Sequence, residues 1–318
     1  MSRHILITGA AGFIGYSLAA RLLQQGEQVL GIDNLNHYYD VQLKQARLAR
    51  LQAFDGFHFA QTDVADSAAL SNAFQSQHFD VVVHLAAQAG VRYSIENPAA
   101  YVQANLVGFA NMLECARHNK VGHLVYASTS SVYGANTKMP FSVHQNVDHP
   151  LSLYAATKKA NELMAHSYAL NHGLAVTGLR FFTVYGPGQR PDMGFHRFIR
   201  AVLTGQPITL YGDGEQTRDF TFVTNVVDGV IRAAETPGVG GQVFNVATNS
   251  RISLNQLLAT LKKIFNSGVE PIYKDARQGD VRDSQADIDE ARRLLGYTPI
   301  VGLEEGLRQT VDWYKAAN

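Results

Sequence analysis

The sequence predicts an α/β protein in which a doubly wound parallel sheet is joined to a smaller C-terminal lobe. Two observations favour this class: short β-branched runs alternate with helical stretches, and a glycine-rich turn follows the first of these runs. A third is that the alternation loosens after "VYGPGQRPDMG", where glycine-containing loops connect shorter elements. We therefore expect one large layered lobe and one small lobe.

The elements of the large lobe are expected in a regular order. Strands are predicted at 4–9, 28–33, 58–63, 79–87, 123–129 and 175–182. The helices between them should begin near Gly12, Asp66, Asn97 and Ser152, and the last two are long and rich in alanine. Strands that alternate with helices in this way pair in parallel, so a helix-covered parallel sheet is predicted.

The boundary between the lobes is not expected to be a single cut. Residues 1–180 should form the large lobe and residues 181–318 mainly the small one. The segment 221–249 contains a strand-like run, "QVFNVAT", that we expect to return to the large lobe.

Composition narrows the class of function. The 318 residues carry 27 Lys and Arg against 27 Asp and Glu, so no basic surface is available for nucleic acid, and small-molecule partners are expected. The beginning of the chain does not resemble a signal peptide, and no segment approaches the length of a membrane span, so a cytoplasmic protein without membrane contact is expected. The lone Cys115 and the scattered histidines predict no disulfide and no metal site, and His84 in "VVVHLAA" is expected to be a hydrogen-bonded core residue.

A glycine turn and a following acid indicate a dinucleotide site. Gly9, Gly12 and Gly15 lie directly after an apolar strand and open a helical pattern, where the missing side chains allow the backbone to approach a pyrophosphate. Asp33 ends the second strand, where a carboxylate accepts hydrogen bonds from a ribose diol and repels a 2′-phosphate. The alternative interpretation is that the glycines only form a tight turn and that Asp33 only caps a loop. The combination predicts a Rossmann-type domain that binds NAD in preference to NADP.

The segment "LYAATKKANEL" places Tyr154 and Lys158 four residues apart on one face of a helix. A tyrosine titrates near pH 10, so its use as a base at neutral pH requires a pKa about 3 units lower, which nearby cations favour. Most such pairs are ordinary surface pairs, but "ASTSSVYG" supplies hydroxyls at the end of the preceding strand. We therefore expect proton transfer by Tyr154 with help from Lys158.

These motifs, with "HLAAQAG" and the later "RDF", resemble the extended short-chain dehydrogenase/reductase family along nearly the whole chain. The resemblance implies that Tyr154 is the acid and base, that Lys158 tunes it and binds ribose, and that Thr129 assists. It also implies a homodimer that pairs long helices, here near 97–118 and 152–172. The residues that it implies for NAD binding are Gly9, Gly12, Phe13, Ile14, Gly15, Asp33, Asn34, Asp63, Val64, Leu85, Ala86, Ala87, Gln88, Asn105, Tyr154 and Lys158.

A narrower resemblance concerns the substrate. The segments "DNLNHYYD", "HLAAQAGVRYSIENP", "VYASTSSVYG" and "LRFFTVYGPGQRPDM" are similar to UDP-glucuronate 4-epimerases, which implies 4-epimerisation of a UDP-sugar through a transient 4-keto sugar. The implied roles are a diphosphate clamp by two arginines, a ribose contact by an acid, a hold on the sugar carboxylate, and room at C2. Arg218 and Arg277 would clamp the diphosphate, and Asp280 would contact the uridine ribose. Ser131, Thr183 and Arg190 would hold the carboxylate, and the small Ser284 would leave room at C2. Ser130 and Arg92 are further candidates for substrate binding.

Some residues depart from this pattern and leave alternatives open. Gly188 and Gln189 replace a Trp-Gly pair, and "GDGEQTRDFTFVTNVVDG" is more like neighbouring branches of the family. The small Ser284 would admit an N-acetyl group, so a UDP-N-acetylglucosamine or UDP-glucose 4-epimerase is the alternative. A non-catalytic NAD-binding regulator is a further alternative. Ser131 stands where dehydratases and decarboxylases carry an acid, which favours an epimerase.

Overall fold

The computed structural model describes residues 2–266, 269–275 and 281–317. Its centre is a seven-stranded sheet in the order β11-β6-β5-β4-β1-β2-β3, with every neighbouring pair parallel. The strands are β1 (His4–Thr8), β2 (Gln28–Asp33), β3 (Phe57–Gln61), β4 (Val81–His84), β5 (His123–Thr129), β6 (Val176–Phe181) and β11 (Val243–Val246). The predicted α/β class with a doubly wound parallel sheet is confirmed.

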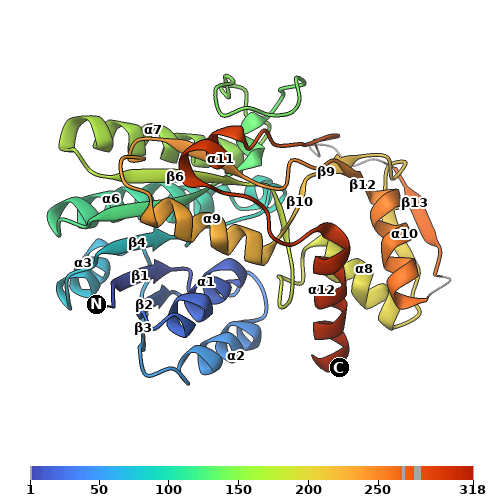
Figure 1. The fold of residues 1–318 in the computed structure, drawn as a ribbon, viewed down its shortest axis with the longest axis horizontal. Helices are drawn as coiled ribbons and strands as arrows, with labels where there is room; N and C mark the ends of the chain where they lie inside the picture. Colours follow the sequence, from blue (N-terminus) through green and yellow to red (C-terminus); the bar gives the residue numbers. More distant parts are fainter. Residues whose placement is uncertain (1, 267–268, 276–280, 318) are drawn as a thin grey trace.

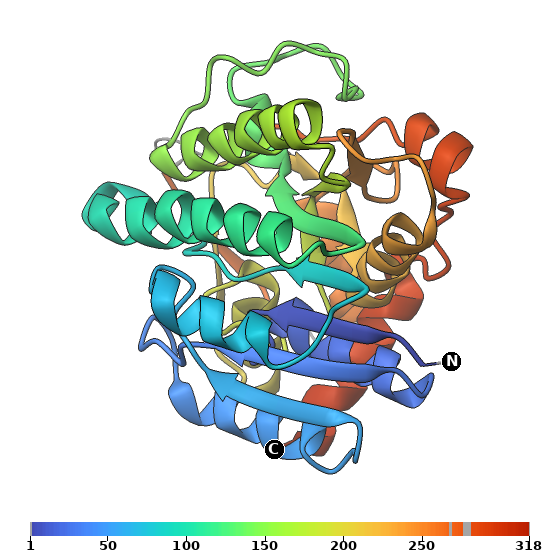
Figure 2. The same ribbon diagram turned by 90° about the vertical axis from the view of Figure 1, so that its left-hand side faces the viewer.

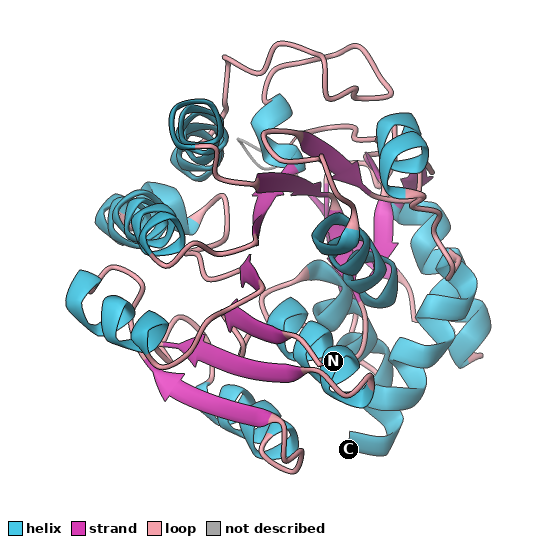
Figure 3. Ribbon diagram, turned by 60° about the vertical axis from the view of Figure 1, so that its left-hand side comes forward, coloured by secondary structure: helices cyan, strands magenta, loops and turns pink. Residues whose placement is uncertain are grey.

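Helices cover both faces of this sheet (Figure 3). One face carries α1 (Phe13–Gln24), α2 (Val41–Leu51) and α9 (Val223–Glu235), whose apolar residues share a core with β1 and β2. The other face carries α3 (Ser67–Gln75), α6 (Gly108–His118) and α7 (Leu153–His172), and Figure 2 shows α6 and α7 side by side. The sheet is therefore buried on both sides, as its β-branched strands require.

Several local details differ from the predicted boundaries. Strand β4 ends at His84, three residues before the predicted end. The Leu85 N–H still bonds to the Thr8 carbonyl oxygen, but the Ala86 N–H bonds to the Thr8 side chain at Oγ1 and so leaves the backbone pairing. The helix expected from residue 97 has three parts, α5 (Pro98–Tyr101), a π-helical stretch (Val102–Val107) and α6, and a short α4 (Tyr93–Glu96) precedes it. Helix α2, which begins after the N-cap Asp40, was not predicted.

The smaller lobe has its own apolar core, built around Ile199, Leu210, Leu257 and Leu307. Figure 1 places this lobe beside the carboxyl-terminal side of the main sheet. Its elements are α8 (Gly194–Leu203), α10 (Leu254–Phe265) and α12 (Leu303–Ala317), with the strand pairs β8 (Ile208–Tyr211) and β13 (Pro271–Lys274), β9 (Thr217–Arg218) and β12 (Ile252–Ser253), and β7 (Thr183–Tyr185) and β10 (Phe220–Phe222).

The chain crosses between the two lobes more than once. Strand β11 joins the central sheet beside β6, and α9 packs against α1, although both lie in sequence between elements of the small lobe. A short helix, α11 (Asp289–Leu295), also packs against β11, and a 3-10 turn at Ser130–Tyr133 follows β5. Within the described residues, no helix has both the length and the apolar character needed to cross a membrane.

Candidate active site

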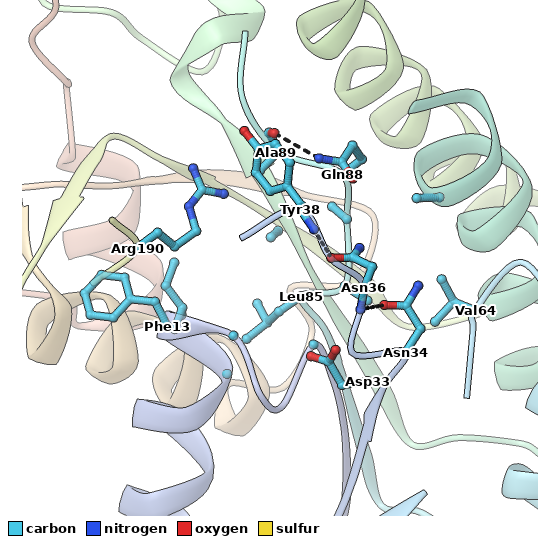
Figure 4. Close-up of a pocket in the computed structure, with 18 of the residues that line it drawn as sticks. Phe13, Asp33, Asn34, Asn36, Tyr38, Val64, Leu85, Gln88, Ala89 and Arg190 are labelled. Carbon is cyan, nitrogen blue, oxygen red and sulfur yellow. Dashed lines mark hydrogen bonds between the residues drawn. The ribbon is translucent and has the colours of Figure 1, made fainter. Parts of the chain in front are cut away.

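The strand order changes direction at β1, which has β2 on one side and β4 on the other. In open α/β sheets ligands bind at such a point, outside the carboxyl ends of the strands. A cavity lies at this place, and its lining includes the turn after β1, the end of β2 and the ends of β4 and β5. Figure 4 shows Phe13, Asp33, Asn34, Leu85 and Arg190 arranged around it.

The glycine turn forms one wall of the cavity. Gly9 has a φ of +72°, in the left-handed region that favours glycine, and a Cβ there would lie 2.9 Å from the Ala86 nitrogen. A Cβ on Gly15 would collide with the Gly9 carbonyl oxygen. Gly12 is the N-cap of α1 and offers no side-chain acceptor, so the N–H groups of the first turn are available to an anion such as a pyrophosphate.

Asp33 lies at the end of β2, next to this turn, and is 8 % exposed. Its Oδ2 accepts a hydrogen bond from the Ala11 N–H at 3.2 Å, and its Oδ1 accepts one from the Leu35 N–H at 2.9 Å. The carboxylate is thereby fixed at the cavity wall. The donors of the turn fit the diphosphate, and this acceptor fits the ribose, of an adenosine diphosphate group, which is the part of NAD that such a site holds.

Tyr154, Lys158 and Thr129 line the same cavity. Thr129 ends β5, and Tyr154 lies in the first turn of α7, whose N-cap Ser152 accepts a hydrogen bond from the Ala155 N–H at 3.1 Å. Lys158 lies one turn later, is 3 % exposed, and donates from Nζ to the Ala127 carbonyl oxygen at 3.0 Å. A strand end and a helix start therefore present the three side chains together.

The ionisation of this group depends on burial and on nearby positive charge. Burial raises the pKa of Tyr154, and a hydrogen bond with Thr129 and the positive charge of Arg190 act to lower it. Burial lowers the pKa of Lys158 to about 8. Arg190 is thus a cation that favours the Tyr154 phenolate, and the Lys158 ammonium donates to the Ala127 carbonyl oxygen of β5. The tuning of Tyr154 by Lys158 stays a prediction.

The structure brings most of the expected cofactor residues to the cavity. Gly9, Gly12, Phe13, Ile14, Gly15, Asp33, Asn34, Asp63, Val64, Leu85, Ala86, Ala87, Gln88, Tyr154 and Lys158 line it. Asn105 is not among the lining residues. It is 1 % exposed, accepts from the Gln88 N–H at 2.8 Å and donates to Thr157 Oγ1 at 3.0 Å, so it holds the Gln88 segment against α7.

The expected substrate residues lie in separate places. Arg190 lines the cavity, with its guanidinium 3.1 Å from Asp192 and 5.8 Å from the centre of the Tyr38 ring. Ser130 and Ser131 follow β5, and Thr183 begins β7, but these three are not part of the lining.

The remaining expected contacts are farther along the chain. Arg92 is exposed at the start of α4. In the small lobe the Arg218 side chain donates to the Thr217 and Arg282 carbonyl oxygens, and the buried Ser284 donates its N–H to Thr217. Arg277 and Asp280 lie outside the described residues.

The segment after β2 supplies lining residues that our sequence reasoning missed. Asn36, Tyr38, Tyr39 and Lys44 all face the cavity. Lys44 Nζ donates to the carbonyl and Oδ1 of Asn36, both at 2.8 Å, and lies 4.7 Å from the centre of the Tyr39 ring. The signal was present in "DNLNHYYD", a run of amide and aromatic side chains directly after Asp33.

His84 lies beneath the cavity at the end of β4, and its position agrees with the expected core role. It is 2 % exposed, and its Nδ1 lies 2.9 Å from Thr8 Oγ1. Burial, followed by the positive charge of Lys158, lowers the pKa of His84 to about 3, so the ring is neutral at pH 7. Among the described residues, no group of three or more His, Cys, Asp and Glu side chains is arranged to hold a metal ion.

The sequence matches the NAD dependent epimerase/dehydratase family over residues 5–247, which is most of the chain. The chain belongs to this family. Two similar members are Protein CapI of Staphylococcus aureus, 44 % identical over 98 % of both chains, and UDP-glucuronate 4-epimerase 3 of Arabidopsis thaliana, 44 % identical over 98 % of this chain and 76 % of the relative.

A solved structure of this epimerase/dehydratase family is also similar. The UDP-glucuronic acid 4-epimerase from Bacillus cereus, in complex with UDP-glucuronic acid and NAD, superimposes with a TM-score of 0.93 at 36 % identity, covering 99 % of this chain and all of that one. The resemblance to nucleotide-sugar epimerases that the sequence motifs suggest is confirmed.

Proposed function

We propose that the chain is an NAD-dependent UDP-sugar 4-epimerase that interconverts UDP-glucuronate and UDP-galacturonate. The observation that carries this proposal is a single cavity lined both by the glycine turn with Asp33 and by Thr129, Tyr154 and Lys158. Similarity to UDP-glucuronate 4-epimerases along nearly the whole chain supports the choice of sugar. The enzyme is an isomerase.

The reaction begins at the 4-hydroxyl of the sugar. Tyr154, as the phenolate, takes the hydroxyl proton while the C4–H bond breaks and the hydride leaves, so C4 becomes a ketone. NAD supplies the hydride acceptor and then the hydride donor, and it is unchanged after a full turnover. The ketosugar turns, hydride returns to the opposite face of C4, and Tyr154 gives its proton back to the oxygen. Thr129, which is hydrogen-bonded to Tyr154, shares this proton path.

Lys158 has a binding role in this proposal. It is buried at the cavity wall and fixed by the Ala127 carbonyl oxygen, where its remaining N–H groups can meet a ribose of the cofactor. Asp33 is the acceptor for the other ribose, and its fixed negative charge repels a 2′-phosphate. The cofactor is therefore NAD.

The uronate is recognised by its carboxylate. Arg190 is the guanidinium at the cavity wall, and a guanidinium matches the planar geometry of a carboxylate. Ser131, in the 3-10 turn after β5, presents a hydroxyl where an acid would assist elimination or decarboxylation of the 4-keto sugar. In the small lobe, Arg218 is assigned to the diphosphate.

The active assembly is proposed to be a homodimer that pairs α6 and α7 with their copies in a second chain. This face carries large exposed apolar side chains: Val102 and Val107 on the π-helical stretch are 39 % and 37 % exposed, and Leu163 and Leu170 on α7 are 59 % and 75 % exposed. Exposed apolar side chains that gather on one face indicate a protein contact.

Proton NMR of substrate mixtures tests the proposed function. Purified protein is given UDP-glucuronate, UDP-glucose or UDP-N-acetylglucosamine without added reductant, and the products are identified. UDP-galacturonate should form fastest. Faster conversion of a neutral sugar would move the assignment to a different 4-epimerase, a UDP-pentose product would identify a decarboxylase, and retained NAD without any conversion would indicate a binding protein.

A further inference from the structure

Arg47 is a buried cation on α2 that no step of the proposed reaction uses. Its side chain is 4 % exposed. Its three hydrogen-bond acceptors are neutral oxygen atoms, so dipoles of the backbone and of one phenol hold the charge. Burying a charge costs free energy unless its hydrogen bonds are satisfied, so the three bonds of Arg47 are needed to hold it in this place.

The three acceptors belong to three separate segments around the cavity. Nη1 donates to the Ala11 carbonyl oxygen at 2.8 Å and to the Tyr39 hydroxyl at 3.0 Å, and Nη2 donates to the Gly188 carbonyl oxygen at 2.5 Å. The planar guanidinium fork donates in fixed directions from separate nitrogen atoms, whereas a lysine donates from a single nitrogen atom. One side chain thus joins the glycine turn, the segment after β2 and the loop after β7.

On the cofactor side, Arg47 bonds to the residue that also positions Asp33. The Ala11 N–H donates to Asp33 Oδ2 at 3.2 Å, while the Ala11 carbonyl oxygen accepts from Arg47. The backbone N–H and the carbonyl oxygen of Ala11 are therefore both hydrogen-bonded, one to Asp33 and the other to Arg47. A shift of Ala11 would change its distance to the Arg47 guanidinium.

On the substrate side, Arg47 holds a loop that carries a cavity residue. Gly188 has a φ of +69°, a conformation that favours glycine, and it lies two residues before Arg190. The loop is tightened by a bond from the Gln189 N–H to the Gly186 carbonyl oxygen at 3.3 Å, and Gln189 is 1 % exposed. A shift of the Gly188 carbonyl would therefore move the backbone that carries Arg190.

We propose that Arg47 is a positioning residue that ties the NAD-binding turn to the substrate loop and so sets the place of Arg190 in the cavity. This inference rests on the proposed function, because it assigns Arg190 to the substrate carboxylate. A role in packing alone would make Arg47 matter for stability but not selectively for residues 186–193.

Hydrogen exchange measured by mass spectrometry tests the first half of the proposal without any substrate. In Arg47→Met, amides of segment 186–193 should exchange about 10-fold faster than in wild type, while those of α10 should not change. Arg47→Lys, which keeps the charge but not the fork, should give a smaller effect in the same segment and serves if Arg47→Met does not fold. Arg50→Met is the matched control, because Arg50 lies one turn further along α2 and is exposed.

Kinetics of a double-mutant cycle test the second half. Arg47→Met, or Arg47→Lys in its place, should raise KM for UDP-glucuronate about 10-fold with a smaller change in kcat, and bound NAD should be retained. In an Arg190→Ala background the same change should raise KM less than about 3-fold, because the residue through which Arg47 acts is already gone.

The outcomes separate this inference from the proposed function. Unchanged exchange in 186–193, or equal KM effects in both backgrounds, would overturn the role of Arg47 while the epimerase assignment stands. A normal KM in Arg190→Ala alone would likewise overturn it. If wild type does not convert UDP-glucuronate at all, the proposed function is wrong. Faster hydrogen exchange of segment 186–193 in Arg47→Met would in that case still support the link between the glycine turn and the loop.

Discussion

Tyr154 has one atom that the proposed reaction cannot do without, its phenolic oxygen. Tyr154→Phe deletes this oxygen and keeps the ring, which packs edge-on against Tyr101 with 6.1 Å between centroids. Turnover should fall by about 10³-fold with the fold and bound NAD retained, because a general base contributes roughly 10²–10⁴-fold. Initial rates from NMR and the absorbance of released NAD provide the measurement.

The control for this variant is Tyr273→Phe, which removes a half-exposed phenol from β13 in the small lobe. Its turnover should equal that of wild type. If Tyr154→Phe retained more than about a tenth of the wild-type rate, the role of Tyr154 as the base would be refuted.

His84 should make the protein sensitive to acid. Its pKa is about 3 in the fold and 6.5 in the unfolded chain, so between these values only the unfolded chain binds the proton. Stability therefore falls as pH falls through this window, by roughly 2–3 kcal/mol on reaching pH 4.5. His84→Asn removes this titration and can still bond to Thr8.

Urea unfolding of both proteins at pH 7 and pH 4.5 measures the effect. Wild type should be more stable than His84→Asn at pH 7. The difference between their free energies of unfolding should shrink by about 2–3 kcal/mol at pH 4.5. Stability curves that stay parallel would show that His84 does not titrate in this way.

Some residues of the site could be predicted from local sequence, and others could not. Gly9, Asp33 and Tyr154 each lie in a short segment whose strand or helix context is visible in the sequence. Arg47 gave no such signal, because its role depends on contacts with residues 36 and 141 positions away. Those contacts exist only once α2 has packed over the glycine turn.

Helix α7, which carries Tyr154 and Lys158, is anchored by a buried ion pair. Arg180 on β6 bonds to both Glu162 oxygens at 2.8 Å, and the side chains are 4 % and 5 % exposed. Ser128 donates to the same carboxylate at 2.6 Å, and Arg180 also donates to the Tyr133 hydroxyl at 3.0 Å. The network joins α7 to the ends of β5 and β6, next to Thr129.

Breaking one side of this pair should be more damaging than replacing both. Glu162→Gln leaves a buried guanidinium without its charge partner and should lower the free energy of unfolding by about 3–5 kcal/mol. Glu162→Leu combined with Arg180→Met removes both charges and should cost less than either single change. Urea unfolding of wild type, Glu162→Gln, Glu162→Leu, Arg180→Met and the double variant decides the matter, and a double variant as unstable as the sum of Glu162→Leu and Arg180→Met would contradict this account.

Elements were easier to predict in the large lobe than in the small one. Strand β5 was predicted with its observed bounds, because a buried parallel strand has a nearly continuous apolar run, here "LVYA". Strands β8 and β13 pair across 63 residues, at Ile208 and Pro271, and the π-helical turns before α6 depend on packing against α7. Neither feature follows from local periodicity.

The whole molecule builds the cavity from both halves of the sheet, on either side of the point where the strand order reverses, and from the loop that leads into the small lobe. The glycine turn and Asp33 come from one half of the sheet, and Thr129 and Tyr154 come from the other. Arg190 reaches the cavity from the loop that leads into the small lobe. Leu163 and Leu170, on the proposed dimer face, are not among the residues that line the cavity.

The dimer proposal can therefore be tested without removing any residue of the cavity. Leu163 and Leu170 are seven residues apart on α7, hence on one side of the helix, and they are 59 % and 75 % exposed. Leu163→Glu with Leu170→Glu places like charges at a self-complementary contact and should shift the protein from dimer to monomer. Sedimentation velocity at several concentrations gives the mass, and Ile272→Glu, at an exposed site on β13, is the matched control that should leave it unchanged. A wild-type monomer, or a dimer that survives both glutamates, would place the contact elsewhere or exclude it, whereas a monomeric variant that keeps bound NAD would show that the α6–α7 face serves assembly and the cavity serves catalysis.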